Sequence, residues 1–343
     1  MKLHTRRIAS LASVTLIAGL GLAACGDDSG SGSDSGGSGD SASITMLPKN
    51  LGNPYFDAST TGAETAAGEF GGELEEVGPE TATPDSQVSF INTAAQQGVD
   101  SLIVSANDPT AICDALNEAR DAGVKVVTFD SDTDTECRDI FVNQADAAGI
   151  AKAQVDLIAE QIGDKGKIAI LSAAANATNQ NAWIKLMEED LAANHPNIEL
   201  VDTVYGDDDD QKSFDQTSAL LSRNPDLAGI VSPTTVGIAA AARYLSSSEY
   251  KGKVALTGLG TPDQMRAYIK DGTVTEFALW NPTDLGYLSA YVANALASEE
   301  ITGEEGDTFE AGDLGEYTVG ADGEVLLGEP FVFNAENIDD FSF

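Results

Sequence analysis

Short apolar strands alternate with amphipathic helices from residue 44 to residue 297, and this alternation constrains the fold more than any other feature. Buried strands are predicted at 101–105, 124–129 and 228–232, and a helical pattern follows each of them. Such alternation is typical of parallel sheets that are covered by helices on both faces. Roughly ten strand–helix units exceed one comfortable sheet, and the pattern restarts near Ala145. We therefore predict an α/β fold with two doubly wound parallel-sheet lobes.

Polar residues follow the predicted strands, where open α/β sheets bind their ligands. These positions are rich in Asn, Asp, Gln and Thr, and they hold one Lys and no Arg. Such a set offers both donors and acceptors, which suits a neutral ligand with several hydroxyl groups. The segments are 48–50, 106–108, 130–132, 173–180, 233–235, 259–261 and Asn281.

Charge and histidine content exclude several functions. The chain has 18 Lys and Arg against 56 Asp and Glu, a formal net charge of −38, which repels nucleic acid and anionic membranes. Of the two histidines, His4 lies in the predicted leader and His195 precedes a proline at a helix end. A Ser-His-Asp triad or a His-rich zinc site is therefore not available. We predict no enzyme activity, no cofactor, no metal and no nucleic-acid partner.

Four consecutive aspartates at 207–210 come just before a helical pattern that starts at Lys212. They lack the alternation and the glycine of a calcium-binding loop. Carboxylates at this position cap a helix N-terminus and interact favourably with its dipole. We predict that the run caps the helix.

The first 24 residues have the features of an export signal. Basic residues precede an apolar run at 8–22, which is too short and too rich in Gly and Ala for a transmembrane helix. The run ends in Leu22-Ala23-Ala24-Cys25, which resembles the bacterial lipobox, in which the cysteine is acylated and becomes the mature N-terminus. We predict a lipoprotein signal peptide at 1–24.

Residues 25–43 are predicted to form a tether. The stretch from Asp27 to Ser43 is almost entirely Gly, Ser and Asp, which gives a flexible coil. A lipid on Cys25 would then hold the folded part at the cell membrane, outside the cytoplasm.

Cys113 and Cys137 lie on neighbouring strand–helix units. In an oxidising compartment they could form a disulfide, which would stabilise the fold by roughly 3 kcal/mol through closure of the loop. The alternative is a pair of buried thiols, and the predicted export favours the disulfide.

The chain resembles the type I periplasmic binding proteins, the solute receptors of sugar ABC transporters, and within them the rhamnose-binding and autoinducer-2-binding receptors. The similarity covers essentially all of 43–343. Its main motifs are Leu47-Pro48-Lys49, Asn53-Pro54-Tyr55-Phe56, Phe129-Asp130-Ser131-Asp132, Ala177-Thr178-Asn179-Gln180-Asn181-Ala182-Trp183 and Phe277-Ala278-Leu279-Trp280-Asn281-Pro282.

This resemblance implies two lobes that are joined by three crossings and close on a ligand like a hinge. We expect the crossings near Gln144, at 280–282 and before Val325. The expected lobes are 44–144 with about 282–315, and 145–281 with about 316–343. The tail is predicted to form a hairpin of 317–319 and 325–327 around a turn at 321–323.

The resemblance also implies a ligand set. Positions that match the autoinducer-2 receptors are Lys49, Asp130, Gln180 and Pro233, whereas Asn179 and Thr235 depart from them. An asparagine in place of a carboxylate removes a strong acceptor for ligand hydroxyls. The segment 177–183 is more similar to the rhamnose type, which favours a sugar.

Several of these residues also have a structural interpretation. Asp108 precedes Pro109 and is as suited to cap a helix as to bind ligand. Phe56 either stacks on an apolar sugar face or packs in the first turn of a helix. The full predicted binding set is Lys49, Asn53, Phe56, Asp108, Asp130, Asn179, Gln180, Trp183, Pro233, Thr235 and Asn281.

The leading hypothesis is a monomeric binding protein that captures a small neutral sugar, L-rhamnose or a related aldose, and delivers it to an ABC permease. An autoinducer-2 receptor for ABC uptake is the alternative. A sugar hydrolase that uses Asp130 and Asp132 as its paired carboxylates is a more remote alternative. A sugar-responsive repressor would need a DNA-binding domain where 1–43 holds the lipobox and tether.

Overall fold

The computed structural model describes residues 42–343. The predicted signal peptide, the lipidation site at Cys25 and the tether up to residue 41 lie outside the described residues. Among the helices of 42–343, none is both long and apolar enough to cross a membrane.

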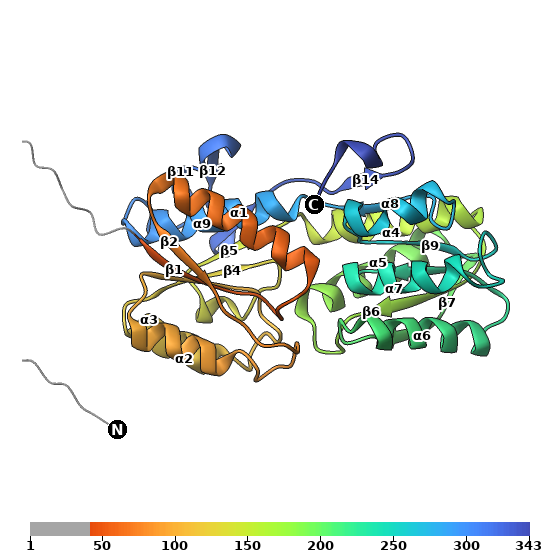
Figure 1. The fold of residues 1–343 in the computed structure, drawn as a ribbon, viewed down its shortest axis with the longest axis horizontal. Helices are drawn as coiled ribbons and strands as arrows, with labels where there is room; N and C mark the ends of the chain where they lie inside the picture. Colours follow the sequence, from red (N-terminus) through yellow and green to blue (C-terminus); the bar gives the residue numbers. More distant parts are fainter. Residues whose placement is uncertain (1–41) are drawn as a thin grey trace, which may run out of the picture. The chain divides into compact units, whose positions relative to one another are not determined.

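The first half of the fold is a six-stranded sheet in the order β13-β5-β4-β3-β1-β2, in which all neighbours are parallel (Figure 1). Helices α1 and α9 cover one face, and α2 and α3 cover the other. The strands are β1 (Ser43–Leu47), β2 (Glu73–Glu76), β3 (Ser101–Val104), β4 (Lys125–Phe129), β5 (Ile140–Asn143) and β13 (Glu324–Leu326). The helices are α1 (Pro54–Phe70), α2 (Val88–Gln97), α3 (Cys113–Asp121) and α9 (Pro282–Ala297).

The second half is a parallel four-stranded sheet in the order β7-β6-β8-β9. Its helices pack in pairs, α4 with α5 and α6 with α7. The strands are β6 (Gly166–Ser172), β7 (Ile198–Tyr205), β8 (Leu227–Ser232) and β9 (Ala255–Gly258). The helices are α4 (Ala147–Ile162), α5 (Thr178–Asn194), α6 (Asp210–Arg223), α7 (Thr235–Ser246) and α8 (Pro262–Lys270). The predicted α/β class with two parallel sheets is confirmed.

The C-terminal segment differs from the prediction. Strand β12 (Glu316–Thr318) pairs with β11 (Thr308–Glu310), and β13 adds to the free edge of β5, so the predicted hairpin of 317–319 with 325–327 is wrong. Pairing with β5 completes backbone hydrogen bonds and buries Val325 fully, which an isolated hairpin would not do.

As a result, the chain stays with the first sheet beyond the expected boundary near residue 316. The third crossing follows Leu326 instead of preceding Val325. After it, β14 (Phe331–Phe333) pairs with β10 (Phe277–Leu279), which a bridge between Leu259 and Ala278 joins to the end of β9.

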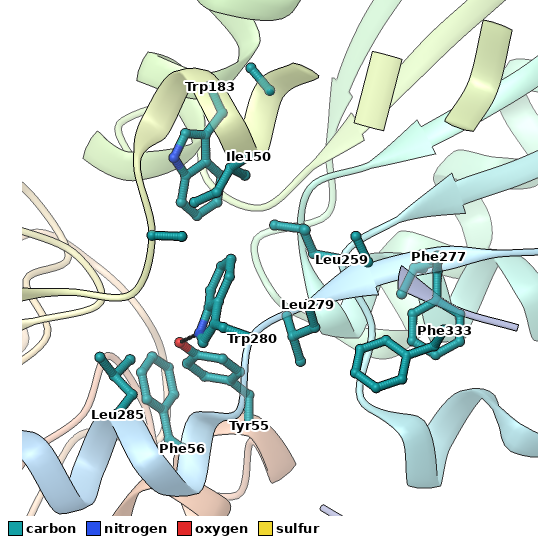
Figure 2. Close-up of a cluster of buried hydrophobic side chains, with 14 of the residues drawn as sticks. Tyr55, Phe56, Ile150, Trp183, Leu259, Phe277, Leu279, Trp280, Leu285 and Phe333 are labelled. Atoms are coloured by element: carbon teal, nitrogen blue, oxygen red, sulfur yellow. Dashed lines mark hydrogen bonds between the residues drawn. The ribbon is translucent and has the colours of Figure 1, made fainter. Parts of the chain in front are cut away.

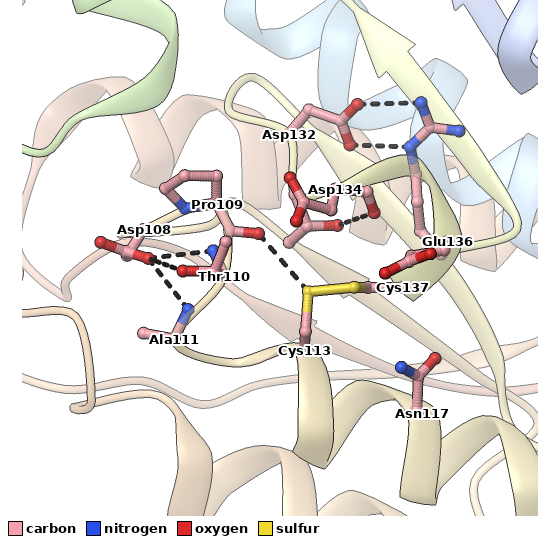
Figure 3. Close-up of a disulfide and its surroundings, with 12 residues drawn as sticks. Asp108, Pro109, Thr110, Ala111, Cys113, Asn117, Asp132, Asp134, Glu136 and Cys137 are labelled. Atoms are coloured by element: carbon pink, nitrogen blue, oxygen red, sulfur yellow. Dashed lines mark hydrogen bonds and ion pairs between the residues drawn. A yellow bond between two sulfur atoms is a disulfide. The ribbon is translucent and has the colours of Figure 1, made fainter.

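Cys113 and Cys137 form the predicted disulfide, with their Cα atoms 5.2 Å apart (Figure 3). Cys113 begins α3, and Cys137 ends a short 3-10 turn, Thr135–Cys137, that follows β4. The bond therefore ties the segment that starts at the end of β4 to the helix beside it.

Helices α1 and α9 begin in the same way and approach each other closely. An asparagine caps each helix through its side chain and a proline follows, Asn53-Pro54 in α1 and Asn281-Pro282 in α9. A Cβ atom on Gly62 of α1 would lie 1.9 Å from the carbonyl oxygen of Thr283, so only glycine permits this backbone contact. The contact fixes the middle of α1 against the start of α9.

We expect Gly62→Ala to destabilise the fold by about 1–3 kcal/mol, because the two helices must separate to admit the methyl group. Gly68→Ala is the matched control in the same helix, since a Cβ there meets no atom within 4 Å. Alanine is the better helix former, so the control should be neutral or stabilising by up to about 1 kcal/mol. Urea denaturation measures both variants, and equal midpoints would contradict this explanation.

Candidate ligand-binding pocket

A pocket lies between the two halves. It is at the carboxyl ends of the strands, where the sequence predicted the ligand. The first half contributes Lys49, Asn53, Tyr55, Phe56 and Asp130. The remaining lining residues are Asn179, Gln180, Trp183, Asp208, Pro233, Thr234, Thr235, Leu259, Leu279 and Trp280.

Asp130 is held in place by a chain of hydrogen bonds. Tyr55 Oη donates to Oδ1 at 3.0 Å, and Ser105 Oγ donates to Oδ2 at 2.8 Å. Trp280 Nε1 donates in turn to Tyr55 Oη at 2.8 Å (Figure 2). Burial, together with the negative charge of Asp130, raises the pKa of Tyr55 well above its ordinary value, so its hydroxyl remains a donor. The carboxylate is thus oriented before any ligand arrives.

Lys49 joins the two halves across the pocket. Its Nζ lies 3.2 Å from Asn179 Oδ1 and 3.8 Å from Asp130 Oδ2, and its side chain is only 5% exposed. Asn179 Nδ2 also donates to the backbone oxygen of Asp130 at 3.3 Å. A buried ammonium requires such partners. The long ion pair leaves the charges of Lys49 and Asp130 able to interact with a polar ligand.

Gln87 organises the two loops beneath Lys49. Its Nε2 donates to the backbone oxygens of Pro48 and Ser105, at 3.1 and 2.7 Å. Its Oε1 accepts from Asn107 N at 3.0 Å, and Asn107 Nδ2 donates to Lys49 O at 2.9 Å. Sequence reasoning did not identify Gln87, because a polar residue just before a helix is ordinarily solvent-exposed and this one is fully buried.

The second half presents an apolar wall and an amide. The rings of Trp183 and Trp280 meet edge to face with centroids 5.9 Å apart (Figure 2). Gln180 precedes Trp183 in the first turns of α5, and its Oε1 is buried without a hydrogen-bond partner among residues 42–343. An unpaired buried acceptor is costly. Its position at the pocket suits a ligand hydroxyl.

The four aspartates at 207–210 do not all cap the helix: one caps α6 and another lines the pocket. Asp209 caps α6 and accepts from Lys212 N at 2.6 Å, as predicted. Asp208 instead lines the pocket and accepts from Thr234 Oγ1 at 2.5 Å. Burial raises the pKa of Asp208 and nearby Asp130 adds to this, while the bond from Thr234 and the charge of Lys49 act in the opposite direction. Applying the strand-end rule to β7 would have found Asp208 in the sequence.

All but two of the predicted binding residues line the pocket. Asp108 and Asn281 do not. Asp108 accepts from the backbone nitrogens of Thr110 and Ala111 in the turn before α3 (Figure 3), and Asn281 caps α9. The sequence prediction omitted other lining residues, among them Tyr55, Thr234, Leu259, Leu279 and Trp280.

The chain matches a known protein family by sequence and several solved structures by fold. The family described as "Periplasmic binding protein domain" matches residues 44–301. A sugar ABC transporter structure from Actinomyces odontolyticus is 56% identical, covers 88% of this chain and 98% of its own, and has a TM-score of 0.72.

Two further structures were solved with ligands. An ABC transporter solute-binding protein from Clostridium phytofermentas with bound L-rhamnose is 40% identical, with 88% of this chain and 98% of that chain covered and a TM-score of 0.85. LsrB from Clostridium saccharobutylicum in complex with AI-2 is 27% identical, with 88% and 99% covered and a TM-score of 0.83.

We expect Tyr55→Phe to lower the free energy of unfolding by about 1–3 kcal/mol, because it leaves the buried Trp280 N–H without its acceptor. Tyr268→Phe on α8 is the control, since its hydroxyl makes no hydrogen bond within 42–343, and it should change stability by less than about 0.5 kcal/mol. Urea denaturation followed by tryptophan fluorescence measures both. A loss for Tyr55→Phe no larger than the control's would show that the chain of bonds does not hold the site.

Proposed function

The chain belongs to the periplasmic binding protein domain family and is a sugar-binding receptor of the ABC-transport type, not an enzyme; we propose that its ligand is L-rhamnose or a closely related aldose. The observation that carries this proposal is the division of the pocket into a polar part and an apolar part. Asp130, Lys49 and Gln180 belong to the polar part, with Asn179, Asp208 and the threonines 234 and 235.

L-rhamnose matches this division. Its hydroxyl groups would donate to the Asp130 carboxylate and to Gln180 Oε1, and would accept from Lys49. Its methyl group, which replaces the hydroxymethyl of ordinary hexoses, would lie against apolar side chains. These are Phe56, Trp183, Leu259, Leu279 and Trp280, all less than 5% exposed. The 40% identity to a structure with bound L-rhamnose supports the same choice.

The two halves would close on the sugar because each contributes part of its hydrogen bonding. A ligand that bonds to both halves stabilises the closed state relative to the open one. Three segments connect the halves and would form the hinge: 144–146 between β5 and α4, 280–281 between β10 and α9, and 327–330 between β13 and β14. The permease would then receive the closed, loaded receptor.

Autoinducer-2 is the second candidate ligand. The AI-2 complex aligns with a TM-score of 0.83, and Lys49, Asp130, Gln180 and Pro233 all line the pocket. Asn179 weakens this candidate, since it provides an amide where the autoinducer-2 set has a carboxylate.

A thermal-shift and calorimetry screen should find L-rhamnose as the ligand. At a hundredfold excess over Kd it should stabilise the protein by about 2.7 kcal/mol, a shift of several degrees. L-mannose adds one hydroxyl that would face the apolar wall unpaired, so we expect its affinity to be at least about tenfold weaker. Autoinducer-2 and D-ribose complete the panel.

Asp130→Asn should weaken L-rhamnose binding by at least about tenfold, because a carboxylate is a stronger acceptor than an amide. Asp134→Asn, an exposed residue of the same segment, is the matched control and should bind normally. A shift with autoinducer-2 alone would replace the proposed ligand, and no shift with any compound would overturn the sugar proposal.

We also propose that acylated Cys25 holds the receptor at the outer face of the cell membrane. The lipobox and the Gly/Ser/Asp tether support this. In a Cys25→Ser variant the protein should leave the membrane fraction, whereas Ser29→Ala should stay in it. Cell fractionation with immunoblotting measures both, and a Cys25→Ser protein that remains membrane-bound would contradict the anchor.

A further inference from the structure

Asp208 has no structural task that accounts for its position. Asp209 caps α6, and Asp207 forms an ion pair with Lys212. The side chain of Asp208 has one hydrogen-bond partner within residues 42–343, the hydroxyl of Thr234, which bonds to Oδ1. Its Oδ2 makes no hydrogen bond there, and the side chain lines the pocket. An acceptor oxygen is therefore available on the side of the pocket opposite the first sheet.

The backbone at this position is left-handed, a conformation that aspartate adopts more readily than most other residues with a side chain. Asp208 has a φ of 51° and Asp207 a φ of 54°, in the left-handed region that glycine adopts most easily. Asp130, which faces the same pocket from the first half, has a φ of 60°. Other left-handed non-glycine residues, Asp164, Glu299 and Asp322, do not line the pocket. Both pocket carboxylates thus come from left-handed positions.

The charges in the pocket do not balance. Asp130 and Asp208 bring two carboxylates to the one ammonium of Lys49 among the lining residues. Burial of Asp208 next to Asp130 is unfavourable for its charged form, as the raised pKa shows. Hydroxyl groups that donate to both carboxylates would offset this cost.

We propose that Asp208 binds the ligand from the second half, accepting a hydroxyl hydrogen bond opposite the one that Asp130 accepts. This inference rests on the proposed sugar-receptor function and narrows its ligand class. The ligand must carry hydroxyl donors at two separate edges, one for each carboxylate. Sugar acids and sugar phosphates are excluded, because a third negative charge would meet two carboxylates.

Calorimetry of Asp208→Asn with L-rhamnose tests this proposal, with L-rhamnonate as the anionic comparison. Asparagine keeps the shape, tolerates the left-handed backbone and still accepts from Thr234. We expect at least tenfold weaker L-rhamnose binding, whereas the ligand-free Tm should equal or exceed that of the wild type. Asp209→Asn is the matched control, because it removes one charge from the same loop and asparagine caps helices equally well. It should bind L-rhamnose within twofold of the wild type.

The outcomes separate the two proposals. Unchanged affinity in Asp208→Asn, or wild-type binding of L-rhamnonate as tight as that of L-rhamnose, overturns the role of Asp208 and leaves the sugar-receptor function intact. If the wild type binds no sugar of the panel, the proposed sugar-receptor function is wrong, whatever the role of Asp208. The stability measurement then decides the role of Asp208: a Tm at or above that of the wild type supports a carboxylate kept for binding, and a lower Tm shows a structural residue.

Discussion

The structure depends on one buried carboxylate that is fixed between two halves of the fold. Asp130 receives hydrogen bonds from Ser105 and Tyr55, and Tyr55 is oriented by Trp280 from the start of the second crossing. A buried charge is stable only when it is paired and hydrogen-bonded. The same bonds that satisfy Asp130 therefore also connect helix α1, the end of β3 and the crossing before α9. Asp130 therefore both lines the pocket and links these three elements of the fold.

Packing far from the pocket sets the position of these groups. The glycine contact fixes the middle of α1, the helix that carries Tyr55 in its first turn, against α9, and Gln87 fixes the loops that carry Lys49 and Ser105. Because each group is oriented in advance, less conformational entropy is lost when a ligand binds. Lys49 and Asp130 are 3.8 Å apart, and Gln180 Oε1 has no hydrogen-bond partner within residues 42–343. These groups can therefore form hydrogen bonds to that ligand.

Much of this arrangement could be predicted from the sequence, because strand–helix alternation has a regular period and ligands collect at strand ends. That reasoning identified Asp130 and Gln180, and also the disulfide partners. It failed for β13, since the pairing of a three-residue strand depends on which sheet edge is free and not on its own pattern. It also missed Asp208 as a pocket residue, because the whole aspartate run was interpreted as a helix cap and the strand-end rule was not applied to β7.

In the proposed complex, a neutral sugar is held between the Asp130 carboxylate of one half and the polar groups of the other. A crystal structure of the protein grown with L-rhamnose tests it most directly. We expect sugar hydroxyls within about 2.5–3.2 Å of Asp130 and Asp208, with the methyl group against Trp183. A sugar bound elsewhere, or bound with its hydroxyls turned away from Asp130, would contradict it.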